Sequence, residues 1–218
     1  MGTVVLAGAT SGSTTLSPTD AVTTVITFPS ASDTLVGKAT TDTLTNKTLT
    51  APAISSAVMT TMASSVLTSA TAQNSTSGTS IDFTSIPSWV KRITVMFSGV
   101  SVSGTSNIQI QLGDSGGVEA TGYLGVTVNY TGSGASNPAT GFAIASALAA
   151  NLLSGHLVLT NISGNIWAAS GLLGTSNTAF VAYTAGNKTL SDTLDRVRIT
   201  TVNGTDTFDA GSINILYE

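Results

Sequence analysis

Apolar and polar residues alternate along most of the second half of the chain. Ile93, Val95 and Phe97 occupy every second position, and residues 108–112 repeat this pattern after a Gly-Thr-Ser turn. A period of two places apolar side chains on one face of a β-strand, and two such runs joined by a short turn predict an antiparallel hairpin. Further runs with strand character lie at 124–130, 156–162, 165–173, 179–183, 196–202 and 212–218.

About eight strands separated by turn residues, within residues 81–218, are typical of an antiparallel β-sandwich, here of jelly-roll type. Within residues 81–218, helical patterning is confined to residues 141–153. The second half of the chain is therefore predicted to be a compact all-β domain.

The first half has no comparable pattern. Short strands are predicted at 4–6, 14–16 and 22–28, and Pro29 ends the third. Beyond it the large aliphatic residues are thinly spaced, so a single chain would bury too little to offset the entropy lost on ordering. Several copies wound about a common axis would share an apolar seam, and a disordered Thr-rich tail is the alternative. The predicted seam residues are Leu35, Leu44, Leu49, Ile54, Val58 and Met62.

A connector links the two halves. Ile54, Val58 and Met62 are spaced four apart, as on one face of a helix, but the surrounding Ser and Thr weaken a helix. A short bundle-forming helix and an extended connector therefore both stay open, followed by a flexible polar joint at 73–80. The predicted parts are an attachment or shaft region (1–55), a connector (56–80) and a β-sandwich knob (81–218).

Composition narrows the classes of function. Only 8 % of the 218 residues are charged, against about 25 % in an ordinary soluble domain. There is no cysteine, which excludes disulfides and thiolate metal sites. With 7 Lys and Arg and a net charge of −4, the chain is a poor candidate for binding nucleic acid. Its longest apolar stretch, 139–153, is shorter than the ~20 residues of a membrane span, so no membrane insertion is expected.

Two segments carry a family resemblance. The first, from Gly12, reads GSTTLSPTDAV…VITFPSASDTLVGKATTDTLTNKTLT, and the second reads IPSWVKRITVMFSGVS…IQIQLGDSGGVEATGYLG. They resemble the N-terminal block and the C-terminal domain of bacteriophage tail-fibre and other virion-fibre proteins, over about residues 12–55 and 85–218.

The resemblance implies a homotrimeric fibre, assembled in the host cytoplasm and located on the virion. Its N-terminal region would build a shaft or bind another virion protein, such as a tail adaptor, nozzle, baseplate or capsid protein. Its C-terminal domain would adhere to a host-surface glycan or protein. A head fibre or decoration protein on the capsid is the alternative, and a bacterial surface adhesin is disfavoured by the absence of a signal segment.

The sequence GDSGG, Gly113–Gly117, resembles the surroundings of a protease nucleophile. A nucleophilic serine needs a histidine base oriented by a carboxylate. The single histidine, His156, follows Ser115, whereas the trypsin-like order places it before the serine. A turn explains the motif better, and His156 is expected to be structural or to line a trimer axis. We expect no enzyme, cofactor or metal, with a serine hydrolase or a glycan depolymerase as the less favoured alternatives.

Two acidic pairs, Asp192/Asp195 and Asp206/Asp209, lack the EF-hand pattern and are predicted to lie in surface turns. If the knob binds a glycan, aromatic rings are the expected platforms, although core packing is the alternative for each ring. The candidates are Tyr123, Tyr130, Trp167 and Tyr183. Trp89, which follows Pro87 at the start of the domain, is expected to be a packing anchor.

Overall fold

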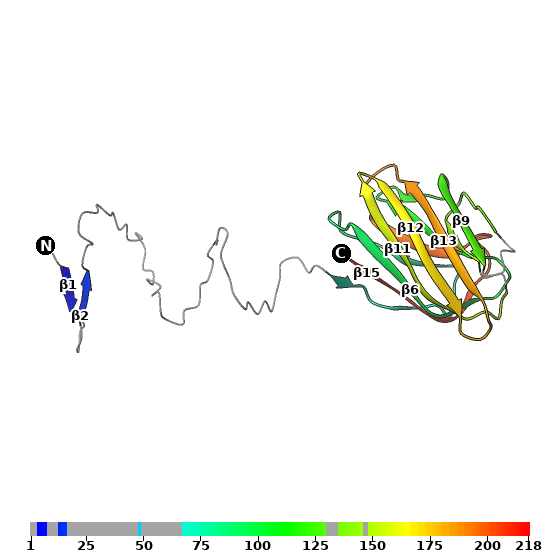
Figure 1. Ribbon diagram of the computed structural model, residues 1–218, viewed down its shortest axis with the longest axis horizontal. Coiled ribbons are helices and arrows are strands. Elements are labelled where there is room, and N and C mark those ends of the chain that lie inside the picture. The colour runs from blue at the N-terminus through cyan, green and yellow to red at the C-terminus, as the bar shows by residue number, and fades with distance from the viewer. Residues whose placement is uncertain (1–3, 8–12, 17–47, 49–66, 130–134, 146–147) are drawn as a thin grey trace. The chain divides into compact units, whose positions relative to one another are not determined.

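The structure, a computed structural model, describes residues 4–7, 13–16, 48, 67–129, 135–145 and 148–218 (Figure 1). The chain divides into two compact units, Met1–Ala57 and Val58–Glu218. The regular structure of the described residues consists of antiparallel β-strands, with no helix. The predicted all-β class is therefore confirmed.

In the first unit, strand β1 (Val4–Ala7) pairs with strand β2 (Ser13–Leu16) in an antiparallel hairpin. These strands match the runs predicted at 4–6 and 14–16. The strand predicted at 22–28 lies outside the described residues, as does every predicted seam residue. The seam residues concerned are Leu35, Leu44, Leu49, Ile54, Val58 and Met62.

The second unit contains an eight-stranded antiparallel sheet in the order β3-β15-β6-β11-β12-β13-β9, with β4 also paired to β15. Figure 1 shows β6, β11, β12, β13 and β9 side by side across this sheet. Its strands are β3 (Thr68–Ser69), β4 (Gln73–Asn74), β6 (Arg92–Val102), β9 (Tyr123–Asn129), β11 (Leu153–Ser163), β12 (Ile166–Thr175), β13 (Val181–Thr189) and β15 (Phe208–Tyr217).

A five-stranded antiparallel sheet completes the second unit. Its order is β10-β7-β14-β5, and β8 pairs with β7. Its strands are β5 (Ser80–Phe83), β7 (Ile108–Asp114), β8 (Gly117–Val118), β10 (Phe142–Ile144) and β14 (Arg196–Thr201).

Apolar side chains from both sheets form one core. Val95 of β6 and Leu157 of β11 contribute from the larger sheet, and Ile110 of β7 and Ile199 of β14 from the smaller one, all without exposed surface. Burial of apolar surface contributes about 25 cal/mol per Å², so these alternating positions stabilise the sandwich. The alternation seen in the sequence therefore identifies the inward-facing residues of β6 and β7 correctly.

The sandwich begins earlier than the predicted boundary at residue 81. Strands β3 and β4 add to the edge strand β15, and Ser75 is fully buried in the expected flexible joint. The Ser75 N–H and hydroxyl donate hydrogen bonds to the carbonyl oxygens of Gly211 and Ala210. Backbone pairing requires no apolar side chain, so a polar segment without hydrophobic periodicity joins the fold.

The helical pattern at 141–153 is wrong where the structure describes it. Residues 142–144 form β10, which pairs with β7, and Leu153 begins β11. A short apolar run has the same appearance in a buried strand as in a buried helix. Among the described residues, no helix has the length and hydrophobicity to cross a membrane.

Candidate functional site

The eight-stranded sheet has one face turned away from the core, which we call the outer face and define by two rows of cross-strand neighbours. The first row is Asn214, Met96, His156, Leu172, Tyr183 and Val128. The second row is Leu216, Thr94, Val158, Ser170, Ala185 and Val126. All twelve side chains are partly or largely exposed, whereas their neighbours along each strand point toward the core.

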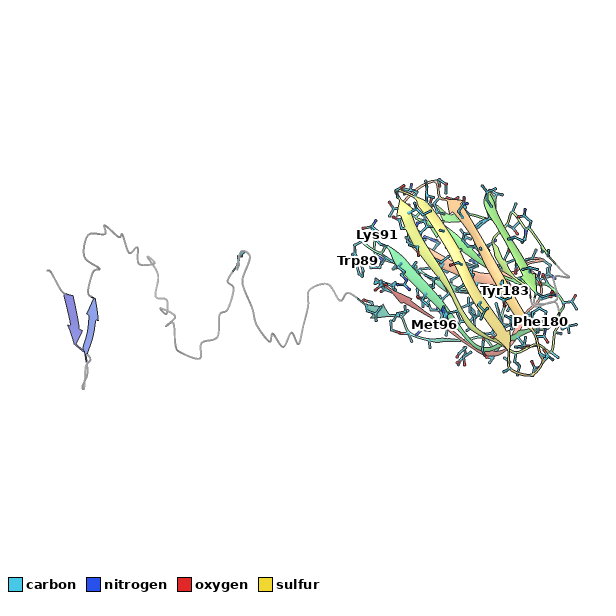
Figure 2. All side chains as sticks on the ribbon, in the orientation of Figure 1. Trp89, Lys91, Met96, Phe180 and Tyr183 are labelled. Carbon is cyan, nitrogen blue, oxygen red and sulfur yellow. The ribbon has the colours of Figure 1, made fainter. Side chains whose placement is uncertain are left out.

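The outer face carries no Asp, Glu, Lys or Arg in either row. Leu172, Tyr183 and Val126 are 49 %, 47 % and 50 % exposed, and Figure 2 labels Met96 and Tyr183 on this face. Beside the second row, Arg92 Nη1 and Glu218 Oε1 form an ion pair of 3.1 Å, which balances the charges there. A sheet face that exposes several apolar side chains and carries no formal charge in these rows is a candidate surface for a partner.

Strand β9 carries apolar residues on its outward side as well as on its core side. Leu124 and Val126 point outward and are exposed, whereas Thr127 points into the core and is 1 % exposed. The Thr127 hydroxyl oxygen accepts hydrogen bonds from the Ala145 N–H at 2.9 Å and from the Thr184 hydroxyl at 3.1 Å. The strand thus places Tyr123 and Thr127 on its core side and leaves the apolar Leu124 and Val126 exposed on its outward side.

The GDSGG motif forms a tight hairpin between β7 and β8. Asp114 pairs with Gly117, and the Asp114 carboxylate accepts a hydrogen bond of 2.8 Å from the Gly116 N–H. Gly117 has a φ of +130°, in the region that favours glycine. The structure does not bring Ser115 and His156 together, because His156 is exposed on the outer face of the other sheet. The motif is a turn, as predicted.

A polar cluster lies beside this turn. Lys188 of β13 is buried and forms an ion pair with Glu119. The Ser191 N–H donates a hydrogen bond of 2.7 Å to Glu119 Oε1, and the Ser191 hydroxyl lies 2.7 Å from Asp114 Oδ2. The cluster therefore fastens the β7–β8 hairpin to the segment that follows β13. Sequence reasoning missed it, because 69 positions separate Glu119 from Lys188 and no spacing rule joins them.

The acids of the cluster are held in the charged form. Hydrogen bonds from the Ser191 hydroxyl and the Gly116 N–H keep the pKa of Asp114 below its ordinary value. Burial raises the pKa of Glu119, but hydrogen bonds from Lys188 and Ser191 outweigh burial and lower the pKa overall. Neither carboxyl is therefore poised to exchange protons near neutral pH. Within the part of the chain that the structure describes, no group of three His, Cys, Asp or Glu could hold a metal ion.

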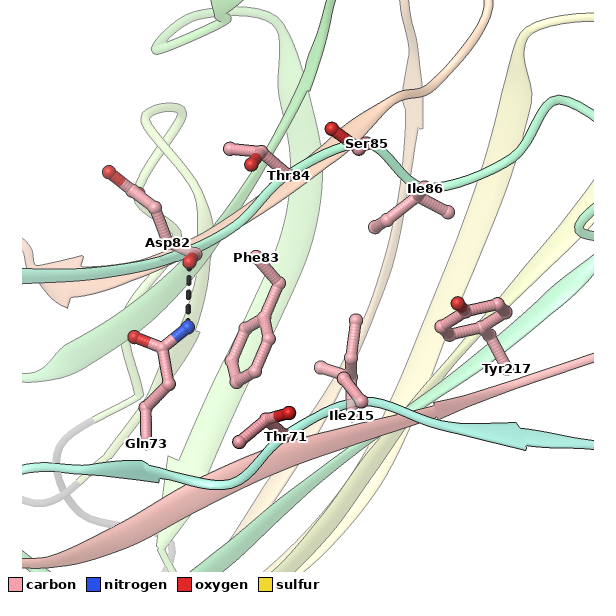
Figure 3. A pocket seen from close by; sticks show the side chains of 10 residues that line it. Thr71, Gln73, Asp82, Phe83, Thr84, Ser85, Ile86, Ile215 and Tyr217 are labelled. Carbon is pink, nitrogen blue, oxygen red and sulfur yellow. Dashed lines mark hydrogen bonds between the residues drawn. The ribbon is translucent and has the colours of Figure 1, made fainter.

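A small hollow of about 250 Å³ lies between β15, the β3–β4 segment and the residues that follow β5 (Figure 3). Phe83, Ile86 and Ile215 contribute apolar surface, and Gln73 donates a hydrogen bond of 2.8 Å to the Asp82 carbonyl oxygen. The Asp82 carboxylate is paired with Arg198 at 2.7 Å. This hollow contains no nucleophile with an adjacent base among its lining residues, so its chemistry supports packing rather than catalysis.

The four aromatic candidates have different environments. Tyr123 and Trp167 are 1 % and 3 % exposed, so they belong to the core and present no ring face to a ligand. Tyr183 alone of the described candidates has an exposed ring, and Tyr130 lies outside the described residues. Trp89 is almost half exposed and contacts the Tyr217 ring at a centroid distance of 6.0 Å, so it packs on the surface.

The acidic pairs stabilise local structure. Asp195 pairs with Arg196 at 2.7 Å, and Asp206 accepts hydrogen bonds from the Ser106 N–H and the Asn203 side chain. The latter two hydrogen bonds lower the pKa of Asp206. Asp192, Asp195 and Asp206 lie outside the strands, in agreement with the prediction. Asp209 lies in strand β15, so the prediction of a turn is wrong for that residue.

Comparisons of the chain with protein-family models, with curated proteins and with solved structures find no match. The fold itself defines an all-β protein with an antiparallel sandwich and an uncharged, partly apolar sheet face.

Proposed function

We propose that the protein is a structural component of a bacteriophage virion, a homotrimeric tail fibre whose C-terminal β-sandwich adheres to the host surface. The outer face is the observation that carries this proposal, since among the described residues it is exposed, partly apolar and without formal charge in its two rows. Association of several copies would remove such a surface from water. The resemblance of residues 12–55 and 85–218 to virion-fibre proteins supplies the biological setting.

In this proposal the two parts of the chain have different roles. Residues 1–55 form a shaft, with the seam residues turned toward a common axis, or attach the fibre to another virion protein. The sandwich forms a jelly-roll-like knob, which contacts a host glycan or protein. Three knobs on one fibre strengthen weak individual contacts, because the first contact raises the effective concentration of the others.

The proposed work is adhesion without a chemical step. Ser115 has no histidine base within reach, and the acids of the polar cluster are held in their charged forms. The proposal therefore includes no catalytic residue, metal or cofactor. Purified protein is expected to release no reducing sugar from host envelopes, and measurable release would replace adhesion by the depolymerase alternative.

The fold is equally compatible with the alternative function, a head fibre or decoration protein on the capsid. Imaging of purified virions labelled with an antibody to this chain distinguishes attachment at the tail from attachment at the capsid. We expect the label at the tail. A label on the capsid would establish the alternative, and virions without the protein would overturn the proposal.

A further inference from the structure

We propose that the outer face of the eight-stranded sheet is the surface through which copies of this chain contact one another. This inference rests on the proposed homotrimer for the identity of the partner, and it adds where in the fold the copies meet.

The charge distribution favours a second copy. The chain has a net charge of −4, so two copies that approach each other carry net charge of the same sign. The two rows of the outer face carry no Asp, Glu, Lys or Arg, and the neighbouring Arg92 is paired with Glu218. Copies that meet through this face therefore desolvate no formal charge in either row.

The exposed apolar residues of β9 also favour a partner on this face. Leu124 and Val126 are 67 % and 50 % exposed, whereas the inward positions of the same strand hold Tyr123 and Thr127, each 1 % exposed. The outward face of an antiparallel strand that meets only water is expected to carry polar side chains. The exposed apolar residues of β9 are explained if a neighbouring copy covers them.

The outer face also has a shape that admits a close partner. Apart from Leu216, the second row consists of the short or branched side chains Thr94, Val158, Ser170, Ala185 and Val126. Sheets pack face to face at about 10 Å, which short side chains permit.

The path of the chain favours a copy over an unrelated protein. Residues 1–66 precede the described part of the sandwich, which begins at Leu67 and continues into β3 at the edge of this same sheet. Copies joined through their N-terminal regions would enter their sandwiches beside the outer face, at high effective concentration. Tyr183 would then be buried between copies, so receptor contacts would fall to other surfaces of the sandwich.

The absence of cysteine permits a direct test. We would introduce Ser170→Cys on the outer face and, as the matched control, Ser115→Cys in the exposed β7–β8 turn of the other sheet. Each full-length variant is treated with a bulky maleimide, in native buffer and in denaturant, and its native mass is measured in parallel. Thiol reactivity depends on access as well as on ionisation, so the ratio of native to denatured rates is compared between variants.

In an assembled protein, we expect Cys labelling at position 170 to be slowed at least about tenfold relative to the control. Equal ratios in an assembled protein would overturn the proposed interface while leaving the homotrimer intact. A monomeric mass would overturn both the interface and the homotrimer. Slow labelling at position 170 in a monomer would show that the chain covers this face with its own N-terminal region, which would also contradict the proposal.

Discussion

Leu172 of β12 and Tyr183 of β13 lie directly opposite each other on neighbouring strands, and both point away from the core. About half of each side chain is exposed, at the centre of a row that contains no formally charged residue. Cross-strand pairs of this kind stabilise a sheet by ~0.2–1 kcal/mol. The area that they leave in contact with water is what assembly would bury.

A charge at this position should oppose assembly. We expect Leu172→Asp to leave the sandwich folded, because the side chain is half exposed, but to weaken association by several kcal/mol, because the carboxylate would be buried without a partner. Native mass measured over a dilution series reports the effect. Val202→Asp, in a turn beyond β14, is the control and should dissociate like the unmodified chain. Identical dissociation of the Leu172→Asp variant would contradict the account.

Breaking the buried ion pair of Lys188 and Glu119 from one side should destabilise the fold far more than breaking an exposed pair. Lys188→Met leaves the Glu119 carboxylate without its cation, and such losses cost ~3–5 kcal/mol. Arg92→Met breaks the exposed pair with Glu218 and should cost at most ~1 kcal/mol. Denaturant unfolding at one fixed chain concentration measures both, because association also contributes to stability.

A double substitution sharpens this prediction. Lys188→Met combined with Glu119→Leu removes both charges, so most of the lost stability should return. If the double variant were as unstable as Lys188→Met, packing of the lysine stem rather than the ion pair would be responsible.

The polar cluster beside the β7–β8 turn should make the stability of the fold sensitive to acid. Asp114 and Glu119 have pKa values below their ordinary values of 3.8 and 4.5 in the folded protein. Acids with a lowered pKa stabilise the fold fully above the ordinary values, and this stabilisation is lost as the pH falls through the folded values. Between about pH 5 and about pH 3, unfolding midpoints should therefore fall more steeply for the unmodified chain than for Asp114→Asn. Parallel pH profiles for the two proteins would show that Asp114 contributes no such stabilisation.

Tyr123 should contribute through its hydroxyl as well as its ring. The hydroxyl oxygen accepts a hydrogen bond of 2.6 Å from the Leu112 N–H, and the hydroxyl donates one of 3.0 Å to the Glu119 carbonyl oxygen. Tyr123→Phe keeps the edge-to-face contact with Phe142 but leaves these groups unpaired, at a cost of ~1–3 kcal/mol. Tyr217→Phe, whose hydroxyl makes no hydrogen bond to a described residue, should change the unfolding free energy by less than ~0.5 kcal/mol. Equal effects of the two substitutions would contradict the role of the Tyr123 hydroxyl.

Sequence patterns predicted the strands well where one face is strictly apolar. Ile93, Val95 and Phe97 of β6 all point inward, as their alternation indicated. Strand β9 shows why the same rule fails elsewhere: Leu124 and Val126 have the expected alternation, but they occupy the opposite face. Periodicity identifies two faces of a strand and does not say which of them a partner covers.

The candidate site was harder to predict for the same reason. Tyr123 and Trp167 looked like ligand-binding aromatics, yet both occupy inward positions that depend on strand pairing across distant parts of the chain. The rows of the outer face are likewise assembled from six strands, so no local segment contains the surface. The resemblance to virion fibres suggested copies of the chain as partners, and only the strand register shows which residues share a face.

The central claim is that this chain works as a homotrimer, and the native mass of the purified full-length protein tests it most directly. One chain has a mass of 21.8 kDa. The account predicts a species of three chains that persists on dilution. A monomer of 21.8 kDa at all concentrations tested would contradict it.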